Sequence, residues 1–597
     1  MLRLGVHRGL FVAATLQCLL ATAACTTQPE YLEVFVGKPV QILNIQFDKV
    51  FYSPGEPLNL TVNLASEQEQ QQVVWLVASI SHLSDALETF REKVDLSGGN
   101  QAVGMSFLPP EGAPRGFGID LYIETDEGYR LASLTSAFDV LNHWTESPRY
   151  GFLSEFGPGR DDSQDTMKIL NRYKVNALQF YDWMYRHEQL LTSQEPYIDL
   201  LGRQLSRNTV DSLIRTAHEH NIACMPYTAV YGSSLAFQEE HREWALLDQK
   251  GQPVLFGENF MAIMDPRPGS PWTAYLLAQF EDVLVNTDFD GIHIDQYGDP
   301  KVGFDQNGER FDLAPALADF INTTKEIVRS HRPNGAVVFN AVTNWPIETV
   351  APADQDIVYI EVWDPYNWFI DLHHLVVQAQ ALGNGKPVVL AAYIDPAHEH
   401  NVRLMDAIIF ASGGGHIELG ERFDSRPGML ADPYFPQFKG MSSELAEAVQ
   451  RLYEFSIRYQ DVIGPRTVDA TSTYQNHISI QGAIIPAGKL KDTIFPVIRN
   501  GGKSGSPGTT TAINLINLLG VKHPEWKVPV SAAPVQMDSI DVQISEVEGS
   551  VTRIWYASPD DGNLAAQELD FQLQDGKLSF QVPSLKYWTM IVIEWSE

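Results

Sequence analysis

The chain has 597 residues, of which 75 are acidic and 42 basic, and its formal net charge at pH 7 is −33. At about 150 residues per domain, this length predicts three or four domains, and the 44% hydrophobic and 20% charged content is that of a folded protein rather than a disordered one. A strongly negative surface repels phosphate backbones, so nucleic acid is not expected as a partner.

The first 25 residues have the features of a bacterial export signal. Arg3 and Arg8 precede a mostly apolar stretch, 9–24, that is too short to span a bilayer comfortably. Residues 22–25, Thr-Ala-Ala-Cys, resemble a lipobox and predict lipidation at Cys25. The mature chain is therefore expected to be an exported lipoprotein held on a bacterial membrane, in the periplasm or at the outer membrane or cell surface. The alternatives are ordinary signal cleavage near the same point and a cysteine without a role.

A β-sandwich of the immunoglobulin-like kind is predicted over residues 31–145. Residues 58–64 alternate strictly between apolar and polar, which is the period of a half-buried strand, and they follow a Ser-Pro-Gly turn. Further strand-like runs cover 73–80, 117–123 and 131–141. Helical periodicity is scarce in this region, which favours a sandwich.

Residues 146–464 are predicted to form a (β/α)₈ barrel, because eight apolar strand-like runs alternate there with helix-like stretches. The predicted strands are 150–156, 177–183, 223–231, 291–297, 336–343, 358–363, 387–394 and 407–417, and the clearest predicted helices are 209–220, 272–286, 313–331, 368–382 and 443–459. A doubly wound open sheet is the competing interpretation, but it seldom needs eight such units.

The last region, residues 465–597, is predicted to be a C-terminal antiparallel β-sandwich. It ends in a strand-like run, 587–595, and shows little helical periodicity. The glycine-rich stretch 501–508 lacks the first glycine of a phosphate-binding loop, since Val497 occupies that position, so a flexible loop is the better interpretation.

Two predicted barrel strands each carry an acid at the carboxyl end. Residues 289–295, Phe-Asp-Gly-Ile-His-Ile-Asp, end in Asp295, and residues 357–363, Ile-Val-Tyr-Ile-Glu-Val-Trp, contain Glu361. Strand ends of a parallel barrel share one face, and a retaining glycoside hydrolase needs a carboxylate nucleophile and a carboxylic acid about 5–5.5 Å apart. Asp295 is the candidate nucleophile and Glu361 the candidate acid/base, because apolar neighbours would raise its pKa. The alternative is that each acid caps a strand end or pairs with a basic residue.

Other predicted strand ends are rich in side chains that bind sugars. Aromatic rings stack on the apolar faces of pyranose rings, and amides, carboxylates and imidazoles hydrogen-bond the hydroxyls. The candidate substrate-binding residues are Tyr181, Asp182, Trp183, Tyr231, His293, Gln296, Asn340, Trp363, Tyr393 and Glu418. Each of them alone is as readily a packing residue at the barrel rim.

No metal site and no cofactor are predicted. The close histidine pairs do not form a helix-borne His-Glu-x-x-His pattern, and two ligands alone do not make a zinc site. Cys224 lies in an apolar run and is expected to be a core residue. The protein is expected to be a monomer.

The two acid-bearing motifs and their spacing resemble those of glycoside hydrolase family 66, the dextranases and cyclodextran-forming glucanotransferases. The resemblance extends to residues 148–152, Pro-Arg-Tyr-Gly-Phe, to residues 179–183, Gln-Phe-Tyr-Asp-Trp, and to the predicted domain order. It implies endo-hydrolysis of α-1,6 linkages in dextran with retention, through a covalent glycosyl-enzyme, with Asp295 as nucleophile and Glu361 as acid/base. Members that make cyclic products carry a large carbohydrate-binding insertion in the barrel, and the short spacings here leave no room for one.

Three functions remain open on the sequence alone. The first is an exported endodextranase acting on dextran or a related α-glucan, and the second is a transglycosylase that forms cyclic isomaltooligosaccharides from the same site. The third is a non-catalytic glycan-binding lipoprotein, which would be free to lose either acid although both are present.

Overall fold

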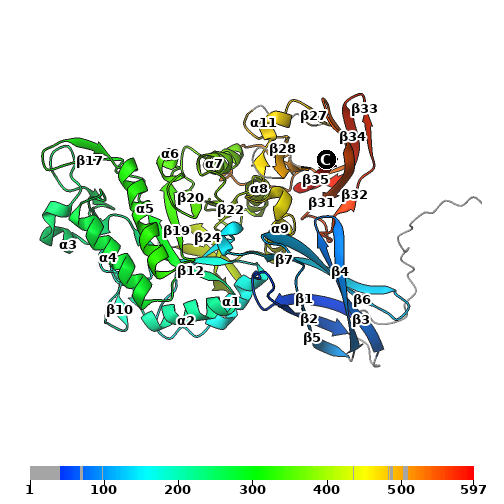
Figure 1. Cartoon of the computed structure of the whole chain (residues 1–597), viewed down its shortest axis with the longest axis horizontal. Helices are drawn as coiled ribbons and strands as arrows, with labels where there is room; N and C mark the ends of the chain where they lie inside the picture. The colour runs from blue at the N-terminus through cyan, green and yellow to red at the C-terminus, as the bar shows by residue number, and fades with distance from the viewer. Residues whose placement is uncertain are drawn as a thin grey trace, which may run out of the picture.

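The computed structural model describes residues 40–596, apart from 67–71, 97, 434–435, 482, 484–487 and 502–508. The predicted signal segment with Cys25 and most of the glycine-rich loop lie outside the described residues. In the part of the chain that is described, no helix combines the length and the hydropathy needed to cross a membrane. The chain forms several regions, with the first and last strands at one end of the molecule and the middle region extending away from them (Figure 1).

The N-terminal region consists of two antiparallel sheets that share one core. Leu58, Leu60, Val62 and Leu64 are buried on one face of β2, so the predicted alternation is confirmed. The immunoglobulin-like connectivity stays a prediction. One sheet contains β1 (Val40–Phe47), β2 (Leu58–Ser66) and β5 (Gly99–Phe107), and the other β4 (Asp85–Leu96), β3 (Gln72–His82), β6 (Arg115–Glu124) and β7 (Arg130–Val140).

The middle region is built on a curled sheet of eleven strands. Eight of them pair in parallel in chain order: β8 (Tyr150–Leu153), β9 (Ala177–Phe180), β12 (Ala223–Ala229), β16 (Gly291–Asp295), β19 (Ala336–Val342), β20 (Ile357–Glu361), β21 (Val388–Ala391) and β22 (Gly415–His416). The sheet continues through β23 (Leu419–Phe423), β24 (Arg426–Asp432) and β25 (Gln437–Lys439). β23 pairs in parallel with β8 at Gly420 and Phe152, so residues 415–423 contact both the last and the first of the parallel strands.

Helices lie between and after these strands, and all five predicted helices begin within two residues of the expected position. The helices are α1 (Ser163–Arg172), α2 (Arg207–Glu219), α4 (Pro271–Asn286), α5 (Ala314–His331), α6 (Ile347–Val350), α7 (Phe369–Leu382), α8 (Glu399–Ala411) and α9 (Ser443–Arg458).

One strand prediction was wrong. Residues 407–411 belong to α8, and only Gly415 and His416 of the predicted eighth strand are extended as β22. The end of α8 is buried on all sides between α7, α9 and strands of the C-terminal region. A helix buried on all sides shows no apolar period, so its sequence cannot be told from that of a buried strand.

Short elements occupy the long connections of the middle region. They are η1 (Trp144–Glu146), β10 (Tyr197–Ile198), β11 (Gln204–Leu205), β13 (Gly232–Ser233), α3 (Leu235–Glu240), η2 (Arg242–Trp244), β14 (Leu255–Phe256), β15 (Met261–Ile263), β17 (Val302–Phe304) and β18 (Arg310–Asp312). The connections after β9 and β12 are the longest of the loops that later line the cavity, and neither was predicted to carry structure of its own.

The C-terminal region again contains two antiparallel sheets around a common core. One has the order β26 (Val468–Asp469), β28 (Ile494–Gly501), β29 (Thr510–Asn517), β35 (Trp588–Trp595), β31 (Val551–Ala557) and β32 (Gln567–Glu568). The other has the order β27 (Ile478–Ile480), β30 (Met537–Ile544), β34 (Lys577–Leu585) and β33 (Phe571–Gln574), and two short helices, α10 (Gln460–Ile463) and α11 (Thr471–Tyr474), lie before β27.

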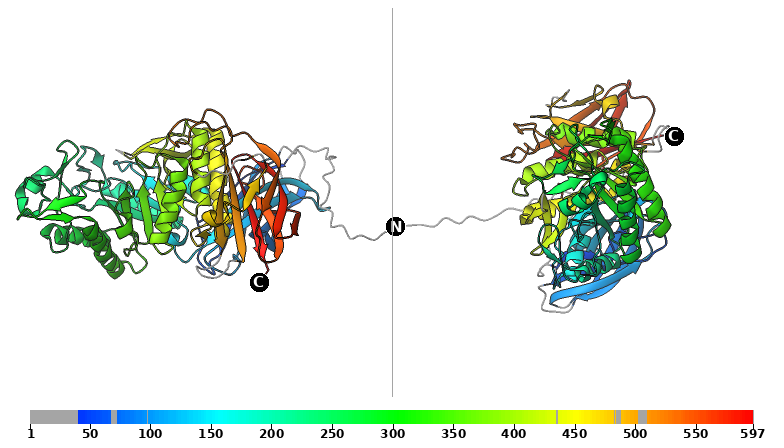
Figure 2. Two further views of the ribbon diagram at one scale, coloured as in Figure 1. Left: turned by 90° about the horizontal axis from the view of Figure 1, so that it is seen from above. Right: turned by 90° about the vertical axis from the view of Figure 1, so that its left-hand side faces the viewer.

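Buried ion pairs join the regions. Arg458 at the end of α9 donates two hydrogen bonds to Asp120 of β6, at 2.8 and 2.9 Å, and its side chain is 1% exposed. Arg149, just before β8, pairs in the same way with Asp139 of β7. The N- and C-terminal regions also touch each other at the same end of the molecule (Figure 2), where Arg553 contacts Asp85.

Candidate active site

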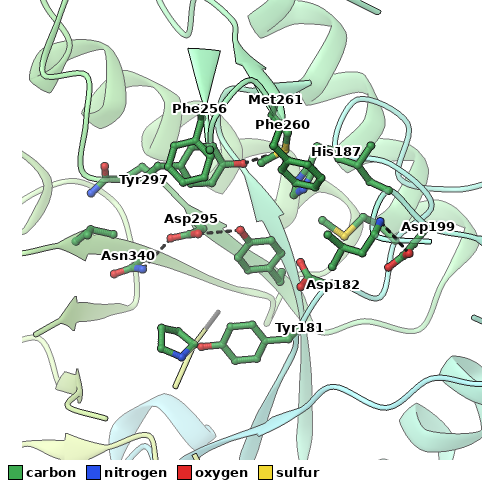
Figure 3. A pocket seen from close by; sticks show the side chains of 18 of the residues that line it. Tyr181, Asp182, His187, Asp199, Phe256, Phe260, Met261, Asp295, Tyr297 and Asn340 are labelled. Atoms are coloured by element: carbon green, nitrogen blue, oxygen red, sulfur yellow. Dashed lines mark hydrogen bonds between the residues drawn. The ribbon is translucent and has the colours of Figure 1, made fainter. Parts of the chain in front are cut away.

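Three neighbouring parallel strands bring the two predicted catalytic acids to one edge of the sheet. Asp295 is the last residue of β16 and Glu361 the last residue of β20, and β19 lies between them. Parallel pairing aligns the carboxyl ends of these strands, with Val342 of β19 opposite Glu361. Two residues earlier on the same strand, Asn340 points toward Asp295 (Figure 3).

Asn340 connects the two acids through a single amide nitrogen. Its Nδ2 donates to Asp295 Oδ1 at 2.7 Å and to Glu361 Oε2 at 3.0 Å. These two carboxylate oxygens are therefore at most about 5.7 Å apart, the sum of the two distances. That bound lies below the 6.5–9.5 Å range of inverting glycosidases and close to the range of retaining ones, about 5–5.5 Å.

Two tyrosines complete the hydrogen bonding of the acids. Tyr227 of β12 donates to Asp295 Oδ2 at 2.8 Å. Tyr393, which follows β21, donates to Glu361 Oε1 at 3.1 Å. Each carboxylate thus accepts one hydrogen bond from the Asn340 amide and one from a tyrosine on or just after the outer neighbouring strand, β12 for Asp295 and β21 for Glu361.

The environment disfavours two negative charges on this pair of acids. Burial raises the pKa of Asp295, as does the neighbouring carboxylate Glu361, and burial likewise raises the pKa of Glu361. Two coupled acids of this kind share a proton over a broad pH range. The bonds to Asp295, 2.8 and 2.7 Å, are shorter than those to Glu361, 3.1 and 3.0 Å. The shorter bonds favour the ionised form of Asp295 over the ionised form of Glu361.

A cavity of about 480 Å³ opens above the two acids. Aromatic rings form much of its wall: Phe256 stacks on Tyr297 with centroids 4.4 Å apart, and Tyr181 stacks on Tyr227 at 5.9 Å. Phe260 is 38% exposed at the rim. A cavity with exposed aromatic faces and two acids on its floor suits a sugar ring.

Six of the ten predicted substrate-binding residues line this cavity with both acids: Tyr181, Asp182, Gln296, Asn340, Trp363 and Tyr393. Asp182 has a left-handed backbone conformation, φ 45°, at the turn after β9. Burial raises the pKa of its side chain to about 6, so Asp182 titrates closer to neutrality than an exposed aspartate.

The other four lie outside the cavity lining. Trp183 is fully buried and donates to the carbonyl of Tyr227 at 3.2 Å. Tyr231 is also fully buried, and its hydroxyl lies 3.4 Å from Gln296 Oε1. His293 points the same way as Asp295 but lies one layer deeper, 2.9 Å from the Tyr150 hydroxyl.

Glu418 is not part of the cavity lining, because it is buried beside His416 and Asp406. Tyr231 and His293 support residues of the cavity instead of lining it. Burial lowers the pKa of His293 to about 3, so this imidazole is neutral at ordinary pH.

Several cavity residues were missed by the sequence analysis. They come from the long connections after β9, β12 and β16: Met184, Tyr185, Arg186, His187, Asp199, Leu200, Leu201, Phe256, Gly257, Phe260, Met261 and Tyr297. A loop residue has no periodic signal that tells which way it points. Only the length of these connections could have indicated that they contribute to the cavity, because long loops at the carboxyl ends of parallel strands often carry the binding site.

A loop of the C-terminal region contacts Trp363, a residue that lines the cavity. Trp526 is fully buried, and its indole donates to the carbonyl of Tyr366 at 3.0 Å. The next residue, Lys527, places its ammonium 4.9 Å from the ring centroid of Trp363. Asn401 of α8 fixes this loop through two bonds of 2.8 Å to the carbonyls of Trp526 and Val528.

Within the described residues, two groups of three side chains come close enough to hold a metal ion. One is His218, Cys224 and Asp290, near the opposite ends of the strands, and the other is the buried group with Glu418. Cys224 itself is fully buried, as predicted for a core residue. Neither group touches the cavity lining.

Known proteins resemble this chain over nearly its whole length. A cycloisomaltooligosaccharide glucanotransferase from Niallia circulans is 23% identical over 98% of this chain and 75% of its own length. A dextranase from Streptococcus salivarius is 20% identical over 80% of this chain and 67% of its own length. The solved structure of a cycloisomaltooligosaccharide glucanotransferase from Paenibacillus sp. has the same fold, with a TM-score of 0.84 at 23% identity over 93% of this chain and all of that one. The model of glycosyl hydrolase family 66 matches residues 47–592, and this chain belongs to that family.

Proposed function

We propose that this protein is an endo-acting hydrolase of α-1,6-glucosidic linkages in dextran, with retention of configuration. The proposal rests mainly on the hydrogen bonds from the Asn340 amide to both acids. They hold the oxygens of Asp295 and Glu361 at most about 5.7 Å apart, close to the separation of a retaining mechanism. The dextranase among the relatives of this chain supports dextran as the substrate.

In the proposed first step, Asp295 attacks the anomeric carbon and forms an ester bond to the sugar. The bond from that carbon to the leaving oxygen breaks, and Glu361 gives this oxygen its proton. In the second step, Glu361 takes a proton from water, and the water oxygen replaces Asp295 at the anomeric carbon. The first step begins with an anionic Asp295 and a protonated Glu361, and the shorter hydrogen bonds to Asp295 favour this arrangement.

We further propose that the parallel strands close into a (β/α)₈ barrel. β22 pairs with β21, and β23, three residues later, pairs with β8. In such a barrel, β22 and β23 would together act as the eighth strand: β22 pairs with the seventh strand, β21, and β23 pairs with the first strand, β8. β24 and β25 would extend the sheet beyond β23. A barrel explains why acids on β16 and β20 share one cavity with residues that follow β9 and β21.

The direct test is to incubate the purified protein with dextran and to analyse the products by mass spectrometry and by NMR of the newly formed anomeric centre. Linear isomaltooligosaccharides, a rapid fall in polymer size and an initial α-anomer are expected. Asp295→Asn should abolish turnover, and Glu361→Gln should retain most activity on glucosides with good leaving groups, which need little protonation. Asp364→Asn is the matched control, since Asp364 is an exposed acid three residues beyond Glu361 and outside the cavity lining.

Unchanged dextran would refute the proposed substrate, and a β-anomer would refute retention. Full activity of Asp295→Asn would refute the assigned nucleophile and would favour a site elsewhere. Binding of dextran without any turnover would favour the non-catalytic glycan-binding alternative.

A transglycosylase that makes cyclic isomaltooligosaccharides is the second candidate, because two relatives at 23% and 24% identity carry that activity in their names. Its products would be lighter by one water than the linear oligosaccharides. The alignment to the first of these relatives spans 748 positions, more than the 597 residues of this chain. That relative therefore contains inserted segments that this chain lacks, which favours simple hydrolysis.

We also propose that the protein is exported and anchored through a lipid on Cys25, and that it acts as a monomer. The support is the sequence of residues 1–25 alone. Metabolic labelling with a fatty acid should mark the wild type and leave Cys25→Ser unlabelled; a labelled variant would refute this anchor.

A further inference from the structure

A buried cluster apart from the active-site cavity joins one histidine to two carboxylates. His416 lies on β22, Glu418 on the link to β23, and Asp406 on α8. All three side chains are at most 1% exposed. His416 Nδ1 is 2.9 Å from Asp406 Oδ1 and 3.5 Å from Glu418 Oε2, so three potential metal ligands converge on one point.

The other ring nitrogen of His416 decides which form of the imidazole is present. Nε2 lies 3.1 Å from the carbonyl oxygen of Ala392, which can only accept a hydrogen bond, so Nε2 carries a hydrogen. In the neutral ring the lone pair is then on Nδ1, and it points at the two carboxylates. This is the tautomer that a metal ligand needs, with the far nitrogen bonded to a backbone carbonyl as an orienting contact.

Within the described residues, no lysine or arginine balances the charge of these two buried acids. Neither oxygen of Glu418, nor Oδ2 of Asp406, accepts a well-aligned hydrogen bond from the described residues. Glu418 lies within hydrogen-bonding reach of Asp406 and of Tyr453, but neither neighbour supplies a positive charge, and the Tyr453 hydroxyl also donates to the carbonyl of His416 at 3.3 Å. In the described part of the chain, His416 is the one potential cationic neighbour of the two acids. Two ionised carboxylates buried beside a single histidine are strongly unfavourable, and a bound cation would neutralise them.

We propose that Asp406, His416 and Glu418 bind a divalent first-row metal ion, with Zn²⁺ as the best match. Tetrahedral Zn²⁺ with bonds of about 2.0–2.1 Å places its ligands about 3.3 Å from one another, and the observed separations of 2.9 and 3.5 Å lie on either side of this value. Calcium and magnesium prefer more ligands, all of them oxygen. The ion neutralises both carboxylates and fastens α8 to the segment that connects β22 with β23.

No sequence motif indicates this site, and no metal was predicted. His416 and Glu418 are two residues apart, but Asp406 is ten residues earlier and reaches them because α8 packs back onto β22. The proposal also gives Glu418 a different role from the substrate binding that was predicted for it.

The test measures metal in the full-length protein after it is unfolded in chelator and refolded with or without Zn²⁺. We expect about one Zn²⁺ per chain by elemental mass spectrometry and a Tm higher by at least about 5 °C in the metal-loaded protein. Refolding with Co²⁺ should produce the visible absorption of a tetrahedral site. His416→Gln and Glu418→Gln should lose the bound metal and the Co²⁺ spectrum, whereas His218→Gln, which alters the other three-residue group, should keep both.

Three results would overturn the proposal. The first is a wild type that binds no metal on refolding and shows no change in Tm, in which case the two acids share protons with His416 instead. The second is unchanged metal content in His416→Gln or Glu418→Gln, and the third is loss of the metal in His218→Gln. If His416→Gln and Glu418→Gln do not fold, the proposal is tested by the Co²⁺ spectra of the wild type and of His218→Gln. A tetrahedral spectrum in both supports the site, and its absence from either one overturns it.

Discussion

Tyr393→Phe isolates the hydrogen bond that tunes the proposed acid. The Tyr393 hydroxyl donates to Glu361 Oε1 at 3.1 Å and so stabilises the ionised form of that carboxyl. Burial raises the pKa of Glu361, and this bond opposes the rise. Without the hydroxyl the pKa rises further, so Glu361 keeps its proton to a higher pH.

The size of the shift follows from the strength of the bond. A hydrogen bond to a charged group contributes about 1.5–3 kcal/mol net, and 1.36 kcal/mol corresponds to one pKa unit, which sets a range of about 1–2 units. Because 3.1 Å is long for a charge-assisted bond, the lower end applies. The alkaline limb of kcat/KM should therefore move up by about 1 pH unit.

The assay is the pH dependence of kcat/KM for dextran. In the proposed mechanism the enzyme is active while Glu361 is protonated and Asp295 is ionised, so activity should be lost as pH rises through the raised pKa of the pair. Tyr231→Phe is the matched control, because the Tyr231 hydroxyl contacts the Gln296 amide and no carboxylate. An alkaline limb that stays in place or moves down in Tyr393→Phe would refute the assignment of Glu361 as the acid.

Three other changes test the site and the fold. Asn340→Ala should lower kcat/KM about 10²–10³-fold, because it removes two charge-assisted bonds to the catalytic acids. Arg458→Met should lower the free energy of unfolding, measured by urea titration, by about 3–5 kcal/mol, since it leaves Asp120 buried without a counter-charge. Gly291→Ala should destabilise the protein by at least about 3 kcal/mol or prevent folding, because its Cβ would lie 1.9 Å from the carbonyl oxygen of Ala336 on β19.

Each of these changes has a matched control. Asn344→Ala removes a buried amide that bonds Tyr366 and Gln378 rather than the acids, and it should lower kcat/KM far less than Asn340→Ala does. Arg242→Met removes an exposed ion pair and should alter stability by less than about 1 kcal/mol. Gly104→Ala adds a Cβ in open space and should be neutral. Equal effects in a variant and its control would show that the named contact is not the cause.

The sequence was sufficient to predict the strands that carry the acids. β16 and β20 are apolar runs that end in an acid, and parallel pairing then makes Asp295 and Glu361 neighbours without further information. Asn340 was predicted for the same reason, since it lies on the strand between them. The residues at strand ends can be predicted to lie together because parallel pairing places the carboxyl ends of the strands at one edge of the sheet.

The positions of loop residues and the end of the buried helix α8 could not be predicted in this way. Tyr231 was predicted to bind substrate, but the chain turns so that Tyr227, four residues earlier, reaches Asp295 instead. Phe256 and Phe260 reach the cavity from a segment whose course depends on the short strands β14 and β15. The C-terminal part of α8 is apolar on every side, which removed the period that distinguishes a helix from a strand.

The loop that carries Trp526 and Lys527 links the C-terminal region to a residue of the active-site cavity. It is anchored on α8 through Asn401, and it places the Lys527 ammonium over the ring of Trp363, which lines the cavity. A truncated protein that ends after α9 would lose this contact together with the strands that cover α8. The C-terminal region therefore supports the position of a cavity side chain although it contributes no lining residue from its described part.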